Sequence, residues 1–252
     1  MRSKRIISLL TTATLAVSAM ISGTFYRDAS AGRISDFVYD DEKGAEGIFV
    51  ANRYAEKCVA LTFDDGPHPT YTGEILDILK ENGARATFFI IGQNAEQYPE
   101  IVLREYSEGH EIGNHTYSHP NMKALDVKKL DEEISKTQSV IKEITGSEPR
   151  LFRPPGGYLK NDFVEATINR NCTSVLWSWR QDTRDWSCPS VNSIVKTVLN
   201  NIQNGDIILF HDFNGGKSPT PEALRIILPK LRKMGYRFVT VSELMDGAVS
   251  MR

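Results

Sequence analysis

From residue 57 to residue 241 the chain alternates between two kinds of segment, and this alternation limits the folds open to it. Short apolar runs rich in β-branched and aromatic residues have the length and composition of buried strands. Longer segments with apolar residues at helical spacing lie between them, and Gly83, Gly109 and Gly146 each end one of these segments. The predicted strands cover residues 57–63, 86–91, 110–114, 151–153, 173–179, 206–211 and 237–241. The predicted helices cover residues 70–82, 98–108, 127–144, 163–171, 191–202 and 221–234.

The order of these elements indicates how the strands pair. Strands that alternate with helices form parallel sheets through right-handed crossovers. About seven strand–helix units favour a barrel over an open sheet, and 252 residues are enough for one such domain. None of the predicted strands is followed by the G-x-G-x-x-G pattern of a dinucleotide site. The expected fold is therefore α/β, a distorted (β/α) barrel with about seven strands, in a single domain over residues 57–246.

The N-terminus has the pattern of an export signal. Three basic residues within the first five precede an apolar run at residues 6–23 that is broken only by Ser and Thr. A basic segment followed by such a run is typical of a secretory signal peptide, and an uncleaved run of this length can act as a signal anchor. We therefore expect residues 1–31 to be a signal peptide or signal anchor and residues 32–56 to be an N-terminal arm or linker.

The charge balance and the cysteines exclude some classes of function. There are 30 basic and 32 acidic residues, a net charge of -2, so no basic surface for nucleic acid is indicated. The three cysteines, Cys58, Cys172 and Cys188, lack C-x-x-C spacing, which argues against a cysteine zinc site or a redox motif. A Cys172–Cys188 disulfide is compatible with an oxidising compartment, although the odd count argues against a disulfide framework.

Polar clusters lie at or just beyond the ends of five predicted strands. The clusters are Asp64-Asp65, His115 to His119, Arg153-Pro154-Pro155-Gly156, Asp182 to Trp186, and Leu209-Phe210-His211. In α/β barrels the residues that carry chemistry lie at the carboxyl ends of the strands. Neighbouring residues on a strand point to opposite sides, so Asp64 and Asp65 can take different roles. A simple acidic turn with Gly66 is the alternative interpretation of this pair.

His115 and His119 have the spacing of a metal-binding pair. Four residues apart, the two rings lie on one side of a helical turn and can reach the same ion. Two surface histidines in a loop are the alternative, but a carboxylate of the Asp64-Asp65 pair would supply a third ligand. Two histidines and one carboxylate leave a coordination position for water, which is typical of a catalytic rather than a structural zinc site.

In this order, the five clusters resemble the five motifs of the polysaccharide deacetylases, the NodB-homology group of carbohydrate esterase family 4. The resemblance runs from about residue 57 to residue 244. It implies that Asp65, His115 and His119 hold a metal ion, which lowers the pKa of its water and polarises the acetyl carbonyl. It also implies that Asp64 is the general base.

The resemblance gives roles to further residues of the clusters. Arg153 matches the arginine that orients the base, and its guanidinium fork suits bidentate pairing with a carboxylate. His211 matches the general acid that protonates the leaving amine, and Asp185 matches the aspartate that orients this histidine. Trp186 and Leu209 match the residues that form the pocket for the acetyl methyl group.

One position departs from the family pattern. An aromatic residue commonly follows Pro-Pro in the third motif, whereas this chain has Gly156 there. The oxyanion contact of the family comes from the backbone N–H at this position, and glycine keeps that N–H. The wall that the aromatic ring would form around the sugar is missing, and Tyr158 is the candidate to fill part of it.

These residues predict a metal-dependent hydrolase that removes N-acetyl groups from amino-sugar polymers. Zn²⁺ is the expected ion, and Co²⁺ or Ni²⁺ would also fit the ligands. The export signal favours cell-wall peptidoglycan as the substrate. Chitin or chito-oligosaccharides are one alternative, and O-acetylated xylan, cleaved by an esterase on the same site, is another. A catalytically silent carbohydrate-binding module is disfavoured because all five expected metal-binding and acid–base residues are present.

The same features predict location and partners. The protein is expected outside the cytoplasm, either secreted or tethered to the cell envelope through residues 6–23. Its expected partner is the N-acetylated polysaccharide, with no nucleic acid, and it is expected to be a monomer.

Overall fold

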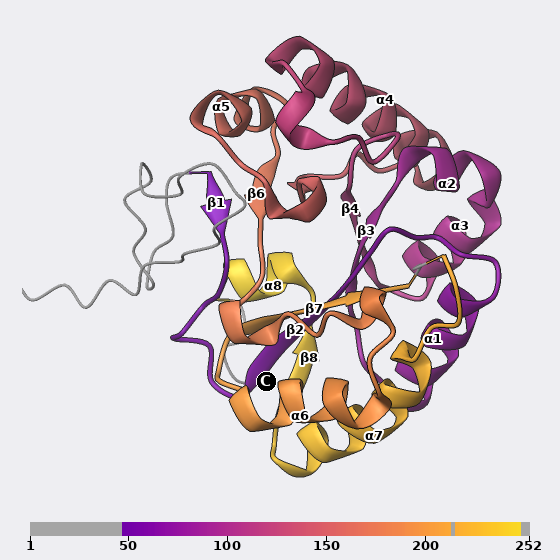
Figure 1. The fold of residues 1–252 in the computed structure, drawn as a ribbon, viewed down its shortest axis with the longest axis vertical. Helices are drawn as coiled ribbons and strands as arrows, with labels where there is room; N and C mark the ends of the chain where they lie inside the picture. Colours follow the sequence, from indigo (N-terminus) through magenta and orange to yellow (C-terminus); the bar gives the residue numbers. More distant parts are fainter. Residues whose placement is uncertain (1–46, 213–214, 248–252) are drawn as a thin grey trace, which may run out of the picture.

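The computed structural model describes residues 47–212 and 215–247 (Figure 1). The expected export signal at residues 1–31 and most of the expected arm at residues 32–56 lie outside this part of the chain. Within it, no helix combines the length and the apolar character that crossing a membrane requires.

A sheet of eight strands forms the centre of the described residues. The strands are β1 (Ile48–Phe49), β2 (Cys58–Asp64), β3 (Thr87–Ile90), β4 (Glu111–Asn114), β5 (Leu151–Phe152), β6 (Thr173–Val175), β7 (Asp206–His211) and β8 (Arg237–Val239). Their order is β1-β6-β5-β4-β3-β2-β7, and all of these pairs are parallel. β8 pairs with the first half of β2, on the edge whose second half pairs with β3.

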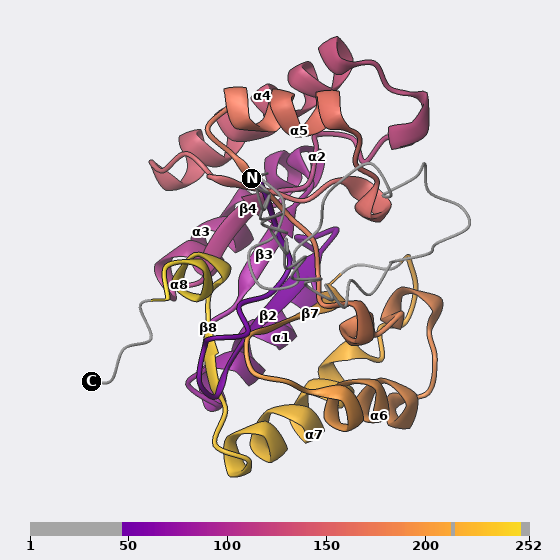
Figure 2. The same ribbon diagram turned by 90° about the vertical axis from the view of Figure 1, so that its left-hand side faces the viewer.

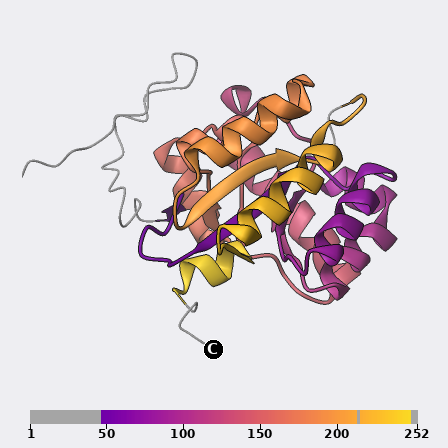
Figure 3. The same ribbon diagram turned by 90° about the horizontal axis from the view of Figure 1, so that it is seen from below.

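Helices surround this sheet (Figure 1). They are α1 (Tyr71–Glu81), α2 (Gly92–Gln97), α3 (Pro99–Ser107), α4 (Val127–Thr145), α5 (Asn161–Asn169), α6 (Val191–Asn201), α7 (Thr220–Lys233) and α8 (Val241–Met245). Short 3₁₀ helices also occur: η2 (Met122–Ala124), η3 (Pro155–Gly157), η4 (Trp179–Gln181) and η5 (Asp185–Ser187). Figure 2 shows α4 and α5 on one side of the strands and α6 and α7 on the other. Figure 3 shows α6 and α7 from below, where the two helices pack against each other.

The expected distorted (β/α) barrel in one domain is confirmed. The distortion lies between β6 and β7, which are not paired as neighbouring strands. The segment after β6 runs beside β7 instead, because Ser178 donates its N–H to the carbonyl of Ile207 and Asp182 forms a single bridge with Leu209. Irregular chain therefore fills the place of a regular strand pair.

The main differences between the structure and the predicted elements concern four segments. β1 lies within the expected arm, and its pairing with β6 adds a strand to the seven predicted ones. α2 follows β3 directly, where no helix was predicted. β6 ends at Val175 rather than at residue 179. The last predicted strand ends at Val239 because Thr240 and Glu243 form a capping box that starts α8.

The three cysteines, all in the described part of the chain, are free. Cys58 and Cys172 are buried and Cys188 is exposed, so a Cys172–Cys188 disulfide is absent from the structure.

Alternation along β2 orients the first acidic residue. All seven residues of the strand are buried. Val59, Leu61 and Phe63 pack in the cluster between sheet and helices, where burying each such side chain contributes about 1.5–3 kcal/mol. Cys58 and Ala60 belong to a second cluster with residues from other strands of the barrel. The two-residue period therefore turns the next members of that series, Thr62 and Asp64, toward the barrel interior.

Candidate functional site

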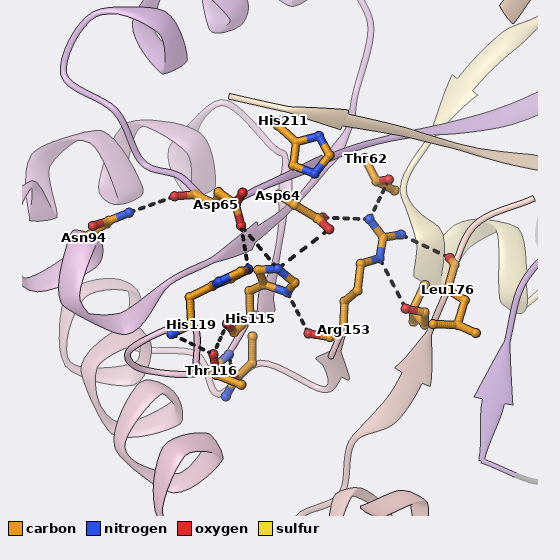
Figure 4. A network of polar contacts seen from close by, with 12 residues as sticks. Thr62, Asp64, Asp65, Asn94, His115, Thr116, His119, Arg153, Leu176 and His211 are labelled. Carbon is orange, nitrogen blue, oxygen red and sulfur yellow. Dashed lines mark hydrogen bonds and ion pairs between the residues drawn. The ribbon is translucent and has the colours of Figure 1, made fainter. Parts of the chain in front are cut away.

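Four expected site residues lie at the carboxyl ends of neighbouring strands. Asp64 ends β2 and His211 ends β7, and the parallel register places their Cα atoms opposite each other. His115 follows β4 directly, and Arg153 follows β5. Figure 4 shows these side chains converging, with His211 on one side of Asp64 and Asp65 and the two histidines His115 and His119 on the other. The strand ends thus bring together residues that are far apart in the sequence.

Arg153 is fully buried and holds Asp64 in place (Figure 4). Its Nη1 donates to Asp64 Oδ1 at 2.7 Å and to Thr62 Oγ1 at 2.8 Å. Its other nitrogens donate to the carbonyl oxygens of Val175 and Leu176, at 3.2 and 3.1 Å. The contact with the carboxylate is therefore made by one nitrogen, and the bidentate pairing expected from the sequence is wrong. The reason is that Nε and Nη2 of Arg153 instead donate to the carbonyl oxygens of Val175 and Leu176.

Burial disfavours the charged form of Arg153, and Asp64 offsets only part of this effect. Burial lowers the pKa of the guanidinium, whereas the charge and hydrogen bond of Asp64 raise it. The guanidinium carbon also lies 4.1 Å from the centre of the Phe89 ring, a favourable cation–π position. A buried pair of this kind becomes strongly destabilising when only one partner is removed.

Asp65 turns out of the strand and meets two histidines. Its φ of 77° lies in the left-handed region, and Asn94 Nδ2 donates to its carbonyl oxygen at 2.7 Å. Its Oδ1 lies 3.3 Å from Nε2 of both His115 and His119. Ligand atoms of these three residues lie within 4.8 Å of one another, so they form a group that could hold a metal ion. Among the described residues no other such group occurs.

Hydrogen bonds orient the two histidines for this purpose. His115 Nδ1 lies 2.7 Å from the carbonyl oxygen of Arg153, so Nδ1 carries the proton and Nε2 is free to face Asp65. His115 is buried, whereas the side chain of His119 is 42% exposed. Thr116 Oγ1 accepts the N–H of His119 at 3.1 Å and donates to the carbonyl of His115.

The charges and the unsatisfied atoms of the group fit a bound cation. Asp65 Oδ1 is buried without a hydrogen-bond partner. Burial would raise the pKa of the Asp65 carboxyl, but the nearby imidazoles of His115, His211 and His119 outweigh burial and lower it. Burial and the charge of His115 lower the pKa of His119, which favours the neutral imidazole. Neutral imidazoles and an ionised carboxylate are the forms that bind metals. Asp64 and Asp65 outweigh burial and raise the pKa of His115, so a cation that binds there would displace a proton from that ring.

His211 has a separate set of partners. Its Nδ1 lies 2.7 Å from Asp185 Oδ1, and its backbone N–H donates to Asp185 Oδ2 at 2.8 Å. Thr220, at the start of α7, donates its hydroxyl to the same Oδ2 at 2.5 Å. Burial would lower the pKa of His211, but Asp185 outweighs it, with help from Asp64 and Asp65, and raises the pKa to about 9.

The three residues expected to contact the substrate lie in different settings. Leu209 is buried on β7. Trp186 follows Asp185 in η5 and is 54% exposed, so its ring is available to a ligand. Gly156 has a φ of 62°, and a Cβ built on it would meet no atom within 4 Å. Its backbone conformation, rather than lack of space, is what disfavours an aromatic residue here. Tyr158 packs against Phe163 of α5 with a ring separation of 6.3 Å.

Comparison with known proteins identifies the family. A family model described as polysaccharide deacetylase matches residues 51–175. A peptidoglycan-N-acetylglucosamine deacetylase of Bacillus cereus is 47% identical over 190 residues, which cover 75% of this chain and 89% of that protein. The chain belongs to the polysaccharide deacetylase family.

One further relative and one solved structure from this deacetylase family extend the comparison. The peptidoglycan-N-acetylmuramic acid deacetylase PdaC of Bacillus subtilis is 40% identical over 191 residues, covering 76% of this chain and 39% of that protein. A crystal structure of a peptidoglycan N-acetylglucosamine deacetylase bound to an N-oxidanyl-benzamide has a TM-score of 0.76 and 39% identity. That match covers 79% of this chain and 92% of the other.

Sequence reasoning missed several groups of this deacetylase site. Thr62 and Thr220 bind its buried charged side chains, and Asn94 binds the backbone of Asp65. Asp212, next to His211, is buried and accepts the Thr72 hydroxyl at 2.5 Å. Burial raises the pKa of Asp212 to about 7. The pattern Leu209-Phe210-His211-Asp212 was visible in the sequence, but an aspartate after a strand carries no signal of burial.

The titration of His211 provides a first prediction for this deacetylase. In the metal-free protein, we expect the imidazole to titrate near the pKa of about 9 given above, whereas Asp185→Asn should lower the pKa markedly from that value. The reason is that burial then acts unopposed by the nearest charge. Nuclear magnetic resonance of the ring protons against pH measures both values. A pKa unchanged by Asp185→Asn would contradict the assignment of the cause.

The sign of the accompanying stability change follows from linkage. Because the folded pKa of His211 lies above the unfolded value, its ion pair stabilises the fold fully below about pH 6.5. That contribution is lost as the pH rises through about 9. Thermal unfolding between these two pH values should therefore show a slope that Asp185→Asn removes.

Proposed function

We propose that this polysaccharide deacetylase removes N-acetyl groups from the amino sugars of cell-wall peptidoglycan. The observation that carries the proposal is the grouping of Asp65, His115 and His119 between two separate buried pairs. Arg153 with Asp64 is one of these pairs, and Asp185 with His211 is the other. The peptidoglycan deacetylases among the relatives support the choice of polymer.

Zn²⁺ is the ion that we propose for the group of two imidazoles and one carboxylate. The orphaned Oδ1 of Asp65 and the short separations of the ligand atoms support this fit, and Co²⁺ or Ni²⁺ would be alternatives. A bound Zn²⁺ ion would acidify a water molecule and polarise the acetyl carbonyl. Chelator treatment should therefore abolish acetate release, and added Zn²⁺ should restore it.

Asp64 is the proposed general base. It lies at the open end of the barrel, beside the metal group, with its Oδ2 3.8 Å from His115 Nε2. Arg153 occupies Oδ1, which leaves Oδ2 to take a proton from the attacking water. The buried guanidinium also keeps the carboxylate in one orientation.

His211 is the proposed general acid. It carries a proton at neutral pH because Asp185 raises its pKa to about 9, and this proton can pass to the leaving amine. Thr220 donates to Asp185, and Asp185 in turn holds the imidazole of His211 by its Nδ1. The other ring nitrogen, Nε2, is therefore the atom that would donate the proton.

The remaining expected residues have proposed binding roles. The backbone N–H of Gly156 would donate to the oxyanion that develops on the acetyl carbonyl. Leu209 and Trp186 would form the pocket for the acetyl methyl group. We also propose that the protein is secreted or tethered through residues 6–23 and acts as a monomer.

Acetate release tests the choice of polymer. The purified protein with Zn²⁺ should release acetate from peptidoglycan faster than from chitin oligomers or acetylated xylan. Peptidoglycan that has been chemically N-deacetylated beforehand is the matched control and should release none. Faster release from chitin oligomers or from xylan would overturn the peptidoglycan assignment in favour of that polymer.

A further inference from the structure

The segment between His115 and His119 is held from one side by a single carboxylate of α4. Glu133 Oε2 accepts the backbone N–H groups of Tyr117 and Ser118, both at 2.8 Å. Its Oε1 accepts the hydroxyl of Ser118, also at 2.8 Å. Hydrogen bonds to an ionised acceptor are roughly twice as strong as neutral ones. One side chain thus satisfies three donors of a three-residue segment.

The first turn of α2 holds the same segment from the other side. The N–H groups of Gly92 and Gln93 donate to the carbonyls of Thr116 and Tyr117, both at 3.0 Å. The approach is close, because a Cβ on Gly92 would lie 2.6 Å from a ring carbon of Tyr117. The carbonyl oxygens thus face α2, while two of the N–H groups face Glu133.

The segment needs such support because its backbone is strained. Thr116 has a φ of 67° and His119 a φ of 51°, both in the left-handed region. Each non-glycine residue held there costs of order 1–3 kcal/mol, so it persists only where the surroundings fix it. His119 is also the more exposed of the two histidines.

We propose that Glu133 is a positioning residue that fixes His119 relative to His115 and so sets the affinity of the metal site. The inference rests on the proposed function, since it takes these histidines as metal ligands. The carboxylate is not used elsewhere: in the described ranges, no Lys, Arg or His side chain forms an ion pair with it. Removing it leaves two backbone N–H groups without their acceptor and frees the strained segment.

Zn²⁺ affinity of the metal-free protein, measured by competition with a chelating dye, tests the proposal. We expect Glu133→Ala to weaken Zn²⁺ binding about 10- to 100-fold, the usual effect of losing a group that orients a metal ligand. The matched control is Glu132→Ala, which removes the same charge from an exposed neighbour on the same helix. It should leave the affinity within about twofold of that of the unmodified chain.

The Glu133→Gln variant separates hydrogen bonding from charge. Its amide oxygen can accept both backbone N–H groups and its NH₂ can donate to the hydroxyl of Ser118. Affinity should therefore return to within about fivefold of the unmodified protein. If Glu133→Gln were as weak as Glu133→Ala, the charge of Glu133 and not its geometry would control the site, and the proposal would be overturned.

A second readout and a second variant keep the test decisive. In Co²⁺-loaded protein, Glu133→Ala should alter the visible absorption bands, and in metal-free protein the amides of Tyr117 and Ser118 should exchange faster. Should Glu133→Ala not fold, Glu133→Met keeps the volume and the helix propensity and carries the same expectations. Unchanged affinity, spectrum and exchange would overturn the positioning role. Failure of the unmodified chain to bind Zn²⁺ would instead overturn the proposed function.

Discussion

His115→Ala is expected to abolish stoichiometric Zn²⁺ binding and to remove nearly all acetate release, while the barrel stays folded. His115 is buried and its Nε2 faces both Asp65 and Asp64, so no other side chain can take its place. The ring lies beyond the end of β4, after the sheet register is already set by Asn114 and Phe152. Its loss should therefore lower the melting temperature without unfolding the protein.

Metal analysis, acetate release and circular dichroism of the same preparation measure this effect. The matched control is His110→Ala, because His110 is also buried but accepts the N–H of Ala86 with its Nδ1 and lies outside the metal group. That variant should lose stability and keep one Zn²⁺ per chain. Stoichiometric Zn²⁺ with full turnover in His115→Ala would show that the ligand assignment is incorrect.

Asp64→Asn is expected to keep the metal and to slow acetate release by about 10²–10⁴, the contribution of a positioned acid or base. Asp65, His115 and His119 are untouched by the change, so the ligand atoms remain together. The amide can still accept the Arg153 hydrogen bond, but the buried guanidinium loses its counter-charge. We therefore expect the free energy of unfolding to fall by about 3 kcal/mol as well.

The neighbouring aspartate supplies the comparison for this experiment. Asp65→Asn should weaken Zn²⁺ affinity, because a neutral amide is a poorer ligand than a carboxylate, and excess Zn²⁺ should restore part of the rate. Zn²⁺ titration of the two variants separates the roles. Loss of the ion from Asp64→Asn together with tight binding in Asp65→Asn would exchange the assignments of the two residues.

Long apolar segments could be located from the sequence with accuracy. The predicted strand at residues 206–211 has the bounds of β7, and α4 begins at the predicted residue and ends one residue later than expected. Both have a strong pattern: β7 has an unbroken apolar run between Asp206 and His211, and α4 has buried Leu130, Ile134 and Ile141 on one face. The end of such a strand could therefore be placed, and with it the cluster that ends in His211.

Short elements could not be predicted, because their structure depends on tertiary contacts. β1 has two residues, too few to show any period, and exists through its pairing with β6. α2 begins with glycine and has the sequence GQNAEQ, which lacks an apolar face of helical spacing. Trp179 is of a residue type that is common in strands. The chain nevertheless leaves the sheet before it reaches Trp179, and the segment there runs beside β7 instead.

The residues that hold the site side chains and backbone in place could not be predicted from the sequence either. Glu133 is one of several charged residues of α4, and nothing in the sequence distinguishes it from Glu132. Thr220 and Asn94 occupy positions where polar residues are common in loops and helix starts. Such contacts join segments distant in the sequence, so only the folded chain identifies them.

The pairing of β2 has a consequence for the order in which the molecule folds. This strand ends in Asp64, the proposed general base, yet one whole edge of it is covered by β7, with Thr62 bonded to a carbonyl 146 residues further along the chain. Contacts of such large sequence separation form slowly. We expect a chain that stops before residue 206 to expose an unpaired edge of β2 and to aggregate. The aspartates thus emerge early in synthesis, but the site becomes complete only after His211 has followed them.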